Sequence, residues 1–171
     1  MHKYLQERPN LEAIDIRTIQ ESDNQAIARV IRSTLKEFGA NHPGTVYYDE
    51  ATDFLFQAFQ LPRSVYYVAL LNGEPVGGGG IFPSPGLPAD TCELVKMYLL
   101  PHVRGIGLGK LLIGKCLQFA KENGYENVYL ETMPELKQAL KTYEKFGFSY
   151  LSEAMGNTGQ FGCALWMLKK L

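Results

Sequence analysis

The chain of 171 residues lacks the features of three large classes of protein. Its longest β-like apolar run, residues 65–71, is far shorter than the roughly 20 residues that span a bilayer, and its polar first ten residues are unlike a signal peptide. Neither sign of charge dominates, with 17 basic and 18 acidic residues, and no basic stripe with interleaved aromatic residues occurs. We therefore expect a cytoplasmic protein that binds neither membranes nor nucleic acid.

Cysteine and histidine are also scarce, with three of each. The cysteines are scattered along the chain, at Cys92, Cys116 and Cys163. They are too few for a disulfide framework and favour small buried thiols in a reducing compartment. The histidines are equally dispersed, so the spacing predicts neither a zinc site nor a Cys–His pair. We expect no metal.

The composition instead favours one folded domain. Hydrophobic residues make up 46% of the chain and charged residues 20%, which is enough apolar material for a sizeable core. No internal repeat or second domain is apparent. We expect a short N-terminal tail at residues 1–12, followed by a single domain at residues 13–171.

Apolar periodicity predicts the order β-α-α-β-β-β-α-β-α-β-β, a mixed α/β fold of about seven strands flanked by four helices. Asn72-Gly73 is a hairpin signal, and the glycines at 77–80 favour a bulge or close backbone packing over the approach of a ligand. Thr132 and Glu135 form a capping-box pair that predicts the start of the last helix. The strands are expected at residues 13–19, 65–71, 77–82, 91–100, 128–132, 148–151 and 163–168, and the second helix at about 50–60.

A glycine-rich turn at residues 104–109 is the strongest local signal. It follows a strand that stops at Pro101 and opens a helix, and its alternate glycines leave backbone N–H groups unshielded at a helix N-terminus, which suits phosphate. Leu111 stands where a Walker A loop needs Ser or Thr, and the glycine spacing does not match a dinucleotide fingerprint. The pattern that the turn does match is R-x-x-G-x-G, at residues 104–109. The alternative is an ordinary turn between strand and helix, whose glycines serve only backbone geometry.

A right-handed crossover through this helix would make the strand at 128–132 parallel to the strand that contains Glu93. The carboxyl ends of both strands would then open beside the helix N-terminus. That is the usual place for a ligand crevice in an α/β sheet.

The R-x-x-G-x-G turn, the element order and the segment A-L-K-T-Y-E-K-F-G-F around Tyr143 resemble the GNAT acetyltransferase superfamily. The resemblance covers residues 14–168 and is most specific over 93–148. It implies a GNAT-like acyl-CoA N-acyltransferase fold and acetyl-CoA as co-substrate. By resemblance, backbone groups of Met97, Tyr98 and Leu99 pair with the pantetheine arm of the coenzyme, and the diphosphate lies on the turn made of Arg104, Gly105, Ile106, Gly107, Leu108, Gly109 and Lys110. Leu136 stands where many relatives carry Asn, which puts one coenzyme contact in doubt.

Acetyl transfer to an amine needs a proton acceptor for the amine and a proton donor for the departing thiolate. The resemblance implies Glu93 as general base and Tyr143 as general acid, with the Leu99 N–H polarising the thioester carbonyl. Glu131, on the neighbouring strand, is the second candidate base, and like-charge repulsion would raise one pKa if both carboxylates line one groove. Alternatively, Glu93 is solvated or paired with Lys96, and Tyr143 is an inward aromatic side chain.

The sequence thus predicts an N-acetyltransferase that acts by direct attack on a small-molecule or peptide amine. The alternatives are a non-catalytic acyl-CoA sensor or partner-docking domain, and another nucleotide at the same turn. By resemblance the acceptor enters between residues 38–50 and 152–161, and the aromatic residues there with two nearby glutamates hint at a small cationic amine. A homodimer formed through the final strands is a further possibility.

Overall fold

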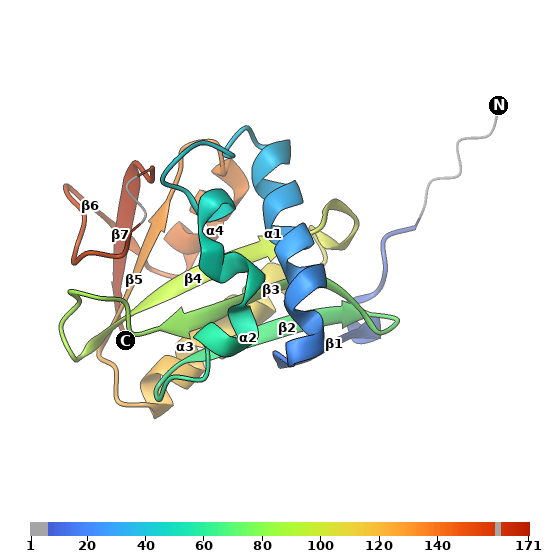
Figure 1. Cartoon of the computed structure of the whole chain (residues 1–171), viewed down its shortest axis with the longest axis horizontal. Helices are drawn as coiled ribbons and strands as arrows, with labels where there is room; N and C mark the ends of the chain where they lie inside the picture. The colour runs from blue at the N-terminus through green and yellow to red at the C-terminus, as the bar shows by residue number, and fades with distance from the viewer. Residues whose placement is uncertain (1–6, 160–161) are drawn as a thin grey trace.

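A seven-stranded mixed sheet forms the centre of the molecule (Figure 1), as seen in a computed structural model that describes residues 7–159 and 162–171. The strand order across the sheet is β1-β2-β3-β4-β5-β7-β6. The strands are β1 (Ile14–Thr18), β2 (Val65–Leu71), β3 (Glu74–Phe82), β4 (Thr91–Leu99), β5 (Asn127–Thr132), β6 (Ser149–Leu151) and β7 (Leu165–Lys170). The helices are α1 (Asn24–Glu37), α2 (Leu55–Ala58), α3 (Leu108–Glu122) and α4 (Lys137–Lys145). The predicted order of strands and helices is confirmed.

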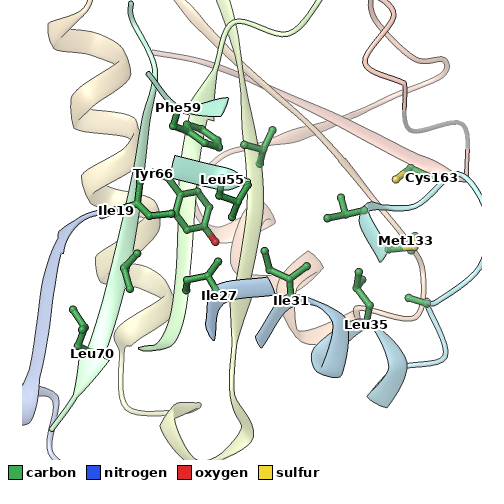
Figure 2. Packing of buried hydrophobic residues seen from close by; sticks show 14 residues of the cluster. Ile19, Ile27, Ile31, Leu35, Leu55, Phe59, Tyr66, Leu70, Met133 and Cys163 are labelled. Atoms are coloured by element: carbon green, nitrogen blue, oxygen red, sulfur yellow. The ribbon is translucent and has the colours of Figure 1, made fainter. Parts of the chain in front are cut away.

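Two helix layers sandwich the sheet because successive side chains on a strand point to opposite faces. On one face, α1 and α2 bury a cluster that includes Ile27, Ile31 and Leu55 against β2 (Figure 2). On the other face, α3 and α4 contribute to a second cluster, which includes Cys116 and Tyr143. The core is thus divided between the two faces, and the central strands β3 and β4 lie between the layers.

The second helix differs from the predicted single helix at residues 50–60. Glu50–Asp53 is a 3-10 turn, Phe54 breaks the run with φ −132° and ψ 41°, and only Leu55–Ala58 is α-helical. Phe54 is exposed, so burial does not hold it in a helical conformation, whereas Leu55 and Phe59 are buried. Asp49, the N-cap of this 3-10 turn, lies close to β4, where its carboxylate contacts Lys96.

The strand β4 opens a cleft by separating from β5. The two strands pair in parallel, as the crossover predicted, but only from Thr91 to Glu93, whose partner is Tyr129. Beyond Glu93, β4 keeps its antiparallel pairing with β3 up to Leu99. The β5 side of β4 is therefore left without a neighbouring strand over its second half.

A bulge in β4 faces the glycine run of β3. Gly78 pairs with Tyr98 and Gly80 with Val95, so Lys96 and Met97 together lie opposite Gly79. Two residues opposing one is the geometry of a β-bulge, which bends the strand and increases its twist. The sequence favoured a bulge or close backbone packing at the glycines; the bulge lies opposite Gly79, but its extra residue belongs to β4. It redirects β4 shortly after the strand leaves β5.

The same glycines allow close packing, which gives a testable prediction about stability. A Cβ on Gly78 would lie 2.6 Å from the Tyr67 carbonyl oxygen and 2.7 Å from the Tyr66 ring. Because the first of these neighbours is backbone, Gly78→Ala is expected to lower the free energy of unfolding by about 1–3 kcal/mol, measured by urea denaturation. Gly114→Ala is the control, because no atom lies within 4 Å of its added Cβ and a mid-helix alanine is expected to stabilise by about 0.5–1 kcal/mol. Equal effects of the two substitutions would contradict this account of the glycine run.

Candidate active site

A groove of about 230 Å³ lies where the open edge of β4 meets the start of α3 and one side of α4. Its lining includes most residues that the sequence predicted for coenzyme binding, namely Met97, Tyr98, Leu99, Arg104, Gly105, Gly107, Gly109 and Lys110, together with Tyr143. Two predicted residues, Ile106 and Leu108, turn their side chains into the core cluster beneath the turn. They can contribute backbone groups only.

The turn that begins α3 leaves its backbone N–H groups without side-chain caps. Gly107 is the N-cap in a left-handed conformation, with φ +92°, and makes no side-chain cap hydrogen bond. Gly105 is also left-handed, with φ +75°. Added Cβ atoms at Gly107 and Gly109 would have no neighbour nearer than 3.7 and 3.6 Å, so this side of the turn is open. Uncapped donors at the positive end of a helix in an open turn fit a diphosphate.

The Arg104 guanidinium is already engaged by the protein. It forms a bidentate pair with Glu37 at the end of α1, with both N–O distances 2.8 Å, and donates to the Leu99 carbonyl oxygen at 2.8 and 3.0 Å. The pair lowers the pKa of Glu37, mainly through the hydrogen bond from Arg104. A second guanidinium, which sequence reasoning missed, lies beside the turn: a Cβ on Gly105 would be 2.5 Å from Nη1 of Arg8.

After the bulge, the N–H and C=O groups of successive β4 residues point alternately toward β3 and toward the open edge. The Leu100 N–H donates to the Val76 carbonyl at 2.8 Å, so Leu100 faces β3. Because an antiparallel ladder alternates, the backbone groups of Leu99 point to the open edge and those of Tyr98 toward β3. Of the predicted backbone positions, Leu99 therefore offers its N–H to the groove, whereas Tyr98 lines the groove with its side chain.

Glu93 is buried beside a second cavity of about 110 Å³ on the α2 side of β4. The residue is 2% exposed, and its carboxylate accepts a hydrogen bond from Ser84 Oγ at 3.2 Å. Burial raises the pKa of Glu93 to about 8, and the charge of Glu131 adds to the increase, while Lys96 and the Ser84 hydrogen bond oppose it. A carboxyl with this pKa can exchange a proton near neutral pH.

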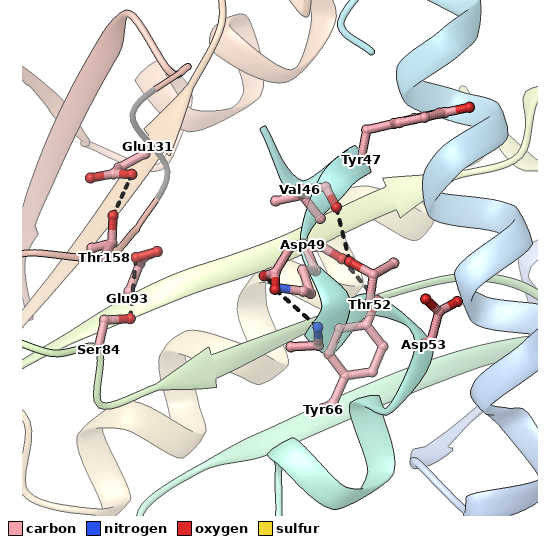
Figure 3. A network of polar contacts seen from close by, with 12 residues as sticks. Val46, Tyr47, Asp49, Thr52, Asp53, Tyr66, Ser84, Glu93, Glu131 and Thr158 are labelled. Carbon is pink, nitrogen blue, oxygen red and sulfur yellow. Dashed lines mark hydrogen bonds and ion pairs between the residues drawn. The ribbon is translucent and has the colours of Figure 1, made fainter. Parts of the chain in front are cut away.

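Glu131 is held by hydrogen bonds at both carboxylate oxygens. Tyr129 donates its hydroxyl to Oε1 and Thr158 donates its hydroxyl to Oε2, each at 2.7 Å. The Tyr129 hydroxyl in turn accepts from the Met155 backbone N–H at 3.1 Å. Figure 3 shows Glu131 with Thr158 next to the pair formed by Glu93 and Ser84. Glu131 therefore anchors the loop that follows β6 beside the Glu93 cavity.

Tyr143 lines both the groove and a third cavity, of about 30 Å³, between β4 and β5. Its ring packs edge-on against Phe148 with centroids 5.9 Å apart. Burial raises the pKa of the Tyr143 hydroxyl, with a smaller contribution from Cys116. This hydroxyl makes no hydrogen bond to any described residue. Every fully buried side-chain oxygen or nitrogen among the described residues has a hydrogen-bond partner, so the Tyr143 hydroxyl is not fully buried. The hydroxyl therefore faces open space.

The three cavities adjoin one another. The groove and the third cavity share Tyr143 and Leu136, and the third cavity shares Lys96 with the Glu93 cavity. The three cavities therefore form a row from the glycine turn, past Tyr143, to Glu93. Its far end is lined by Asp49 and Thr158, from the two segments expected to flank the acceptor, of which residues 160–161 lie outside the described residues.

Lys96 lines two of the cavities, although sequence reasoning did not include it among the site residues. Its side chain is 7% exposed, and its ammonium lies 3.2 Å from Asp49 Oδ2. The sequence suggested Lys96 as a partner of Glu93, but the ion pair that it forms is with Asp49. No local sequence signal marks it, because Lys96 reaches the cavity through the bulge and a contact with a residue 47 positions away.

Two features are absent from the described ranges, 7–159 and 162–171. No helix in them is both long and apolar enough to cross a bilayer. No group of three or more His, Cys, Asp or Glu side chains in them could hold a metal ion.

Comparisons with known proteins agree with the geometry. The model of the acetyltransferase (GNAT) family matches residues 7–148. The chain is 43% identical over 157 residues to the uncharacterized N-acetyltransferase YjgM of Escherichia coli K12, covering 91% of this chain and 94% of that protein. It is 36% identical over 91 residues to human N-acetylaspartate synthetase, covering 53% of this chain and 29% of that protein.

Solved structures show the same fold at low sequence identity. A GNAT-family acetyltransferase from Staphylococcus aureus Mu50 superposes with a TM-score of 0.81 at 20% identity, covering 92% of this chain and 99% of that one. The PaiA N-acetyltransferase of Thermoplasma acidophilum, solved in complex with coenzyme A, has a TM-score of 0.67 at 19% identity, covering 92% and 99%. With a family model over most of its length and a relative at 43% identity, the chain belongs to the GNAT family of acetyltransferases.

Proposed function

We propose that the chain transfers the acetyl group of acetyl-CoA to a primary amine by direct attack, with Glu93 as general base and Tyr143 as general acid. The observation that carries this proposal is the row of neighbouring cavities, with the glycine turn at one end and Glu93 at the other. Two proton-transfer groups at separate cavities of one row suit a reaction in which one proton leaves the amine and another reaches the thiolate.

The coenzyme would be held by backbone groups along the groove. The amides from Arg104 to Lys110 would receive the diphosphate, and Leu99 would offer its N–H on the open edge of β4. Bound acetyl-CoA supplies an activated acetyl thioester. The Leu99 N–H is suited to polarising its carbonyl, because a fixed backbone donor stabilises developing negative charge without reorganising. The PaiA neighbour, which was solved with coenzyme A, supports this assignment.

Glu93 suits the role of base better than Glu131. An alkylamine has a pKa of about 10, so most of it is protonated at neutral pH and must lose a proton before attack. The raised pKa of Glu93, about 8, makes its carboxylate a stronger proton acceptor than an ordinary glutamate. Both oxygens of Glu131 already accept hydrogen bonds within the protein, which leaves it less able to accept a substrate proton. Glu131 therefore acts in this proposal through its charge and its hold on the loop.

Acetyl-CoA binding and free thiol release with a panel of amines test the proposal. Binding with thiol release is the expected result. Binding without release for any amine would favour the acyl-CoA sensor instead, and absence of binding by calorimetry would remove both.

Gly107→Val is expected to weaken acetyl-CoA binding at least tenfold in calorimetry. A β-branched residue is strained at φ +92°, and its side chain would fill the open side of the turn. Gly114→Ala lies in the same helix and has open space around its added Cβ, so it should retain the wild-type Kd. The thermal midpoints of both variants identify any loss that is due to unfolding. Unchanged affinity in folded Gly107→Val would place the diphosphate elsewhere.

A further inference from the structure

Lys96 is held in a conformation that a lysine does not adopt without cost. Its φ is +51° in the middle of β4, a region that glycine enters freely and that costs other residues of the order of 1–3 kcal/mol. Tyr66 of β2 extends past the glycines of β3, and its hydroxyl donates to the Lys96 carbonyl at 2.8 Å, which fixes this backbone. A strained lysine at a bulge points to a use for its side chain.

That side chain places a buried cation between the second and third cavities. Lys96 lines both the Glu93 cavity and the cavity between β4 and β5. An ammonium has three N–H donors, and among the described residues Lys96 directs one hydrogen bond, to Asp49. Asp49 has a side chain 36% exposed, so water can solvate it if the ion pair opens.

The carboxylates near Lys96 are each accounted for by the protein. Glu131 is held by Tyr129 and Thr158, and Glu93 is buried with Ser84 and has a raised pKa that favours its neutral form. The expectation of a cationic acceptor relied on these two glutamates. Their hydrogen bonds within the protein weaken that expectation, because less of their charge is available to a substrate. Among the described residues that line these two cavities, Lys96 is the positively charged one, and its ammonium has donors that the pairing with Asp49 leaves unused.

We propose that Lys96 binds an acidic group of the acceptor, so that the acceptor is a small amine that carries a carboxylate or a comparable anion, as an amino acid does. Without acceptor, Asp49 holds the ammonium in place and competes with the substrate's anion. The cavity of about 110 Å³ is below the roughly 300–1,000 Å³ of pockets for drug-sized ligands, so an acceptor as small as an amino acid suits it. This inference rests on the proposed function.

The first test compares matched acceptors with and without the anion. L-Amino acids, their amides, aminoalkylphosphonates and diamines are supplied with acetyl-CoA, and free thiol is measured. The wild-type enzyme is expected to show kcat/KM at least tenfold higher for an amino acid than for its amide. Activity with phosphonates as well would widen the anion beyond carboxylate. Equal activity with amides or preference for diamines would overturn the inference while leaving the proposed function intact, and no thiol release with any amine would remove the proposed function itself.

Two substitutions then act in opposite directions on the KM for the amino acid. Lys96→Met keeps the length of the side chain but removes the charge, and is expected to raise this KM at least tenfold while leaving the KM for acetyl-CoA unchanged. Asp49→Asn keeps the oxygen that caps Ala51 but removes the competing charge, and is expected to lower it. Lys121→Met, on the exposed end of α3, controls for net charge. If Lys96→Met fails to fold, Asp49→Asn still decides, because an unchanged or raised KM contradicts the proposal.

Discussion

Tyr143→Phe is expected to lower kcat by about 10²- to 10⁴-fold, the usual contribution of a general acid, and to leave the Kd for acetyl-CoA unchanged. The substitution removes one oxygen that faces open space and hydrogen-bonds to no described residue, while the ring keeps its edge-on contact with Phe148. Folding and coenzyme binding should therefore tolerate it. Burial raises the pKa of this hydroxyl, so it stays protonated over the working pH range and can donate to the departing thiolate.

The matched control for this prediction is Tyr150→Phe. Tyr150 is exposed, and its hydroxyl donates to Glu144 on α4 at 2.6 Å, away from the cavities. Steady-state kinetics should show the wild-type kcat for Tyr150→Phe. A kcat of Tyr143→Phe within a factor of three of the wild-type value would leave Tyr143 as a packing residue, with the thiolate protonated by another donor or by water. A matching rise in the Kd for acetyl-CoA would instead assign it to coenzyme binding.

The parts of the site that sequence reasoning anticipated are those fixed by local backbone chemistry. Gly107 and its neighbours predict an open turn at a helix N-terminus because glycine alone reaches positive φ without strain and adds no side chain. The parallel pairing of Glu93 with Tyr129 follows from the handedness of the crossover between the strands. Such rules do not depend on contacts with distant parts of the chain.

The prediction that a capping pair starts α4 was wrong, because pairing between strands overrides the local signal. Thr132 and Glu135 match the local pattern, but α4 begins at Lys137, and its N-cap Leu136 makes no side-chain hydrogen bond. Thr132 instead extends β5, where it is buried and pairs with Leu165 of β7. Pairing with a strand more than thirty residues later in the chain outweighed a local helix signal.

The features that sequence reasoning missed depend on contacts between distant residues. Arg104 meets Glu37 across 67 positions, and the strained backbone of Lys96 is held by Tyr66 across 30 positions. Neither pairing has a spacing that a single sequence can report. A bulge could be expected at the glycines of β3, but which residue of β4 it would turn into the cavity could not.

Glu93→Gln is expected to lower kcat/KM by about 10²- to 10⁴-fold, because an amide cannot accept the proton of the amine. The amide oxygen of the introduced glutamine can still accept the hydrogen bond from Ser84, so the cavity should keep its shape. In the wild-type enzyme, kcat/KM should rise with pH up to the pKa of Glu93, about 8, since the carboxyl must be ionised to act as a base. This rising limb of the pH–rate profile should be absent in Glu93→Gln, whose remaining activity depends only on ionisation of the amine.

Two further measurements separate a catalytic Glu93 from a merely buried one. Glu131→Gln removes the charge that helps to raise the pKa of Glu93, so the limb should move to lower pH in that variant. For stability, the pKa of Glu93 rises from 4.5 to about 8 on folding, so the folded state binds more protons between these values and the free energy of unfolding falls as pH increases through that window. Glu93→Gln should remove this fall whether or not Glu93 is the base. A variant that loses the pH dependence of unfolding but keeps the wild-type pH–rate profile would assign the proton transfer to Glu131 or to water, while wild-type behaviour in both would mean that Glu93 ionises as an ordinary carboxylate.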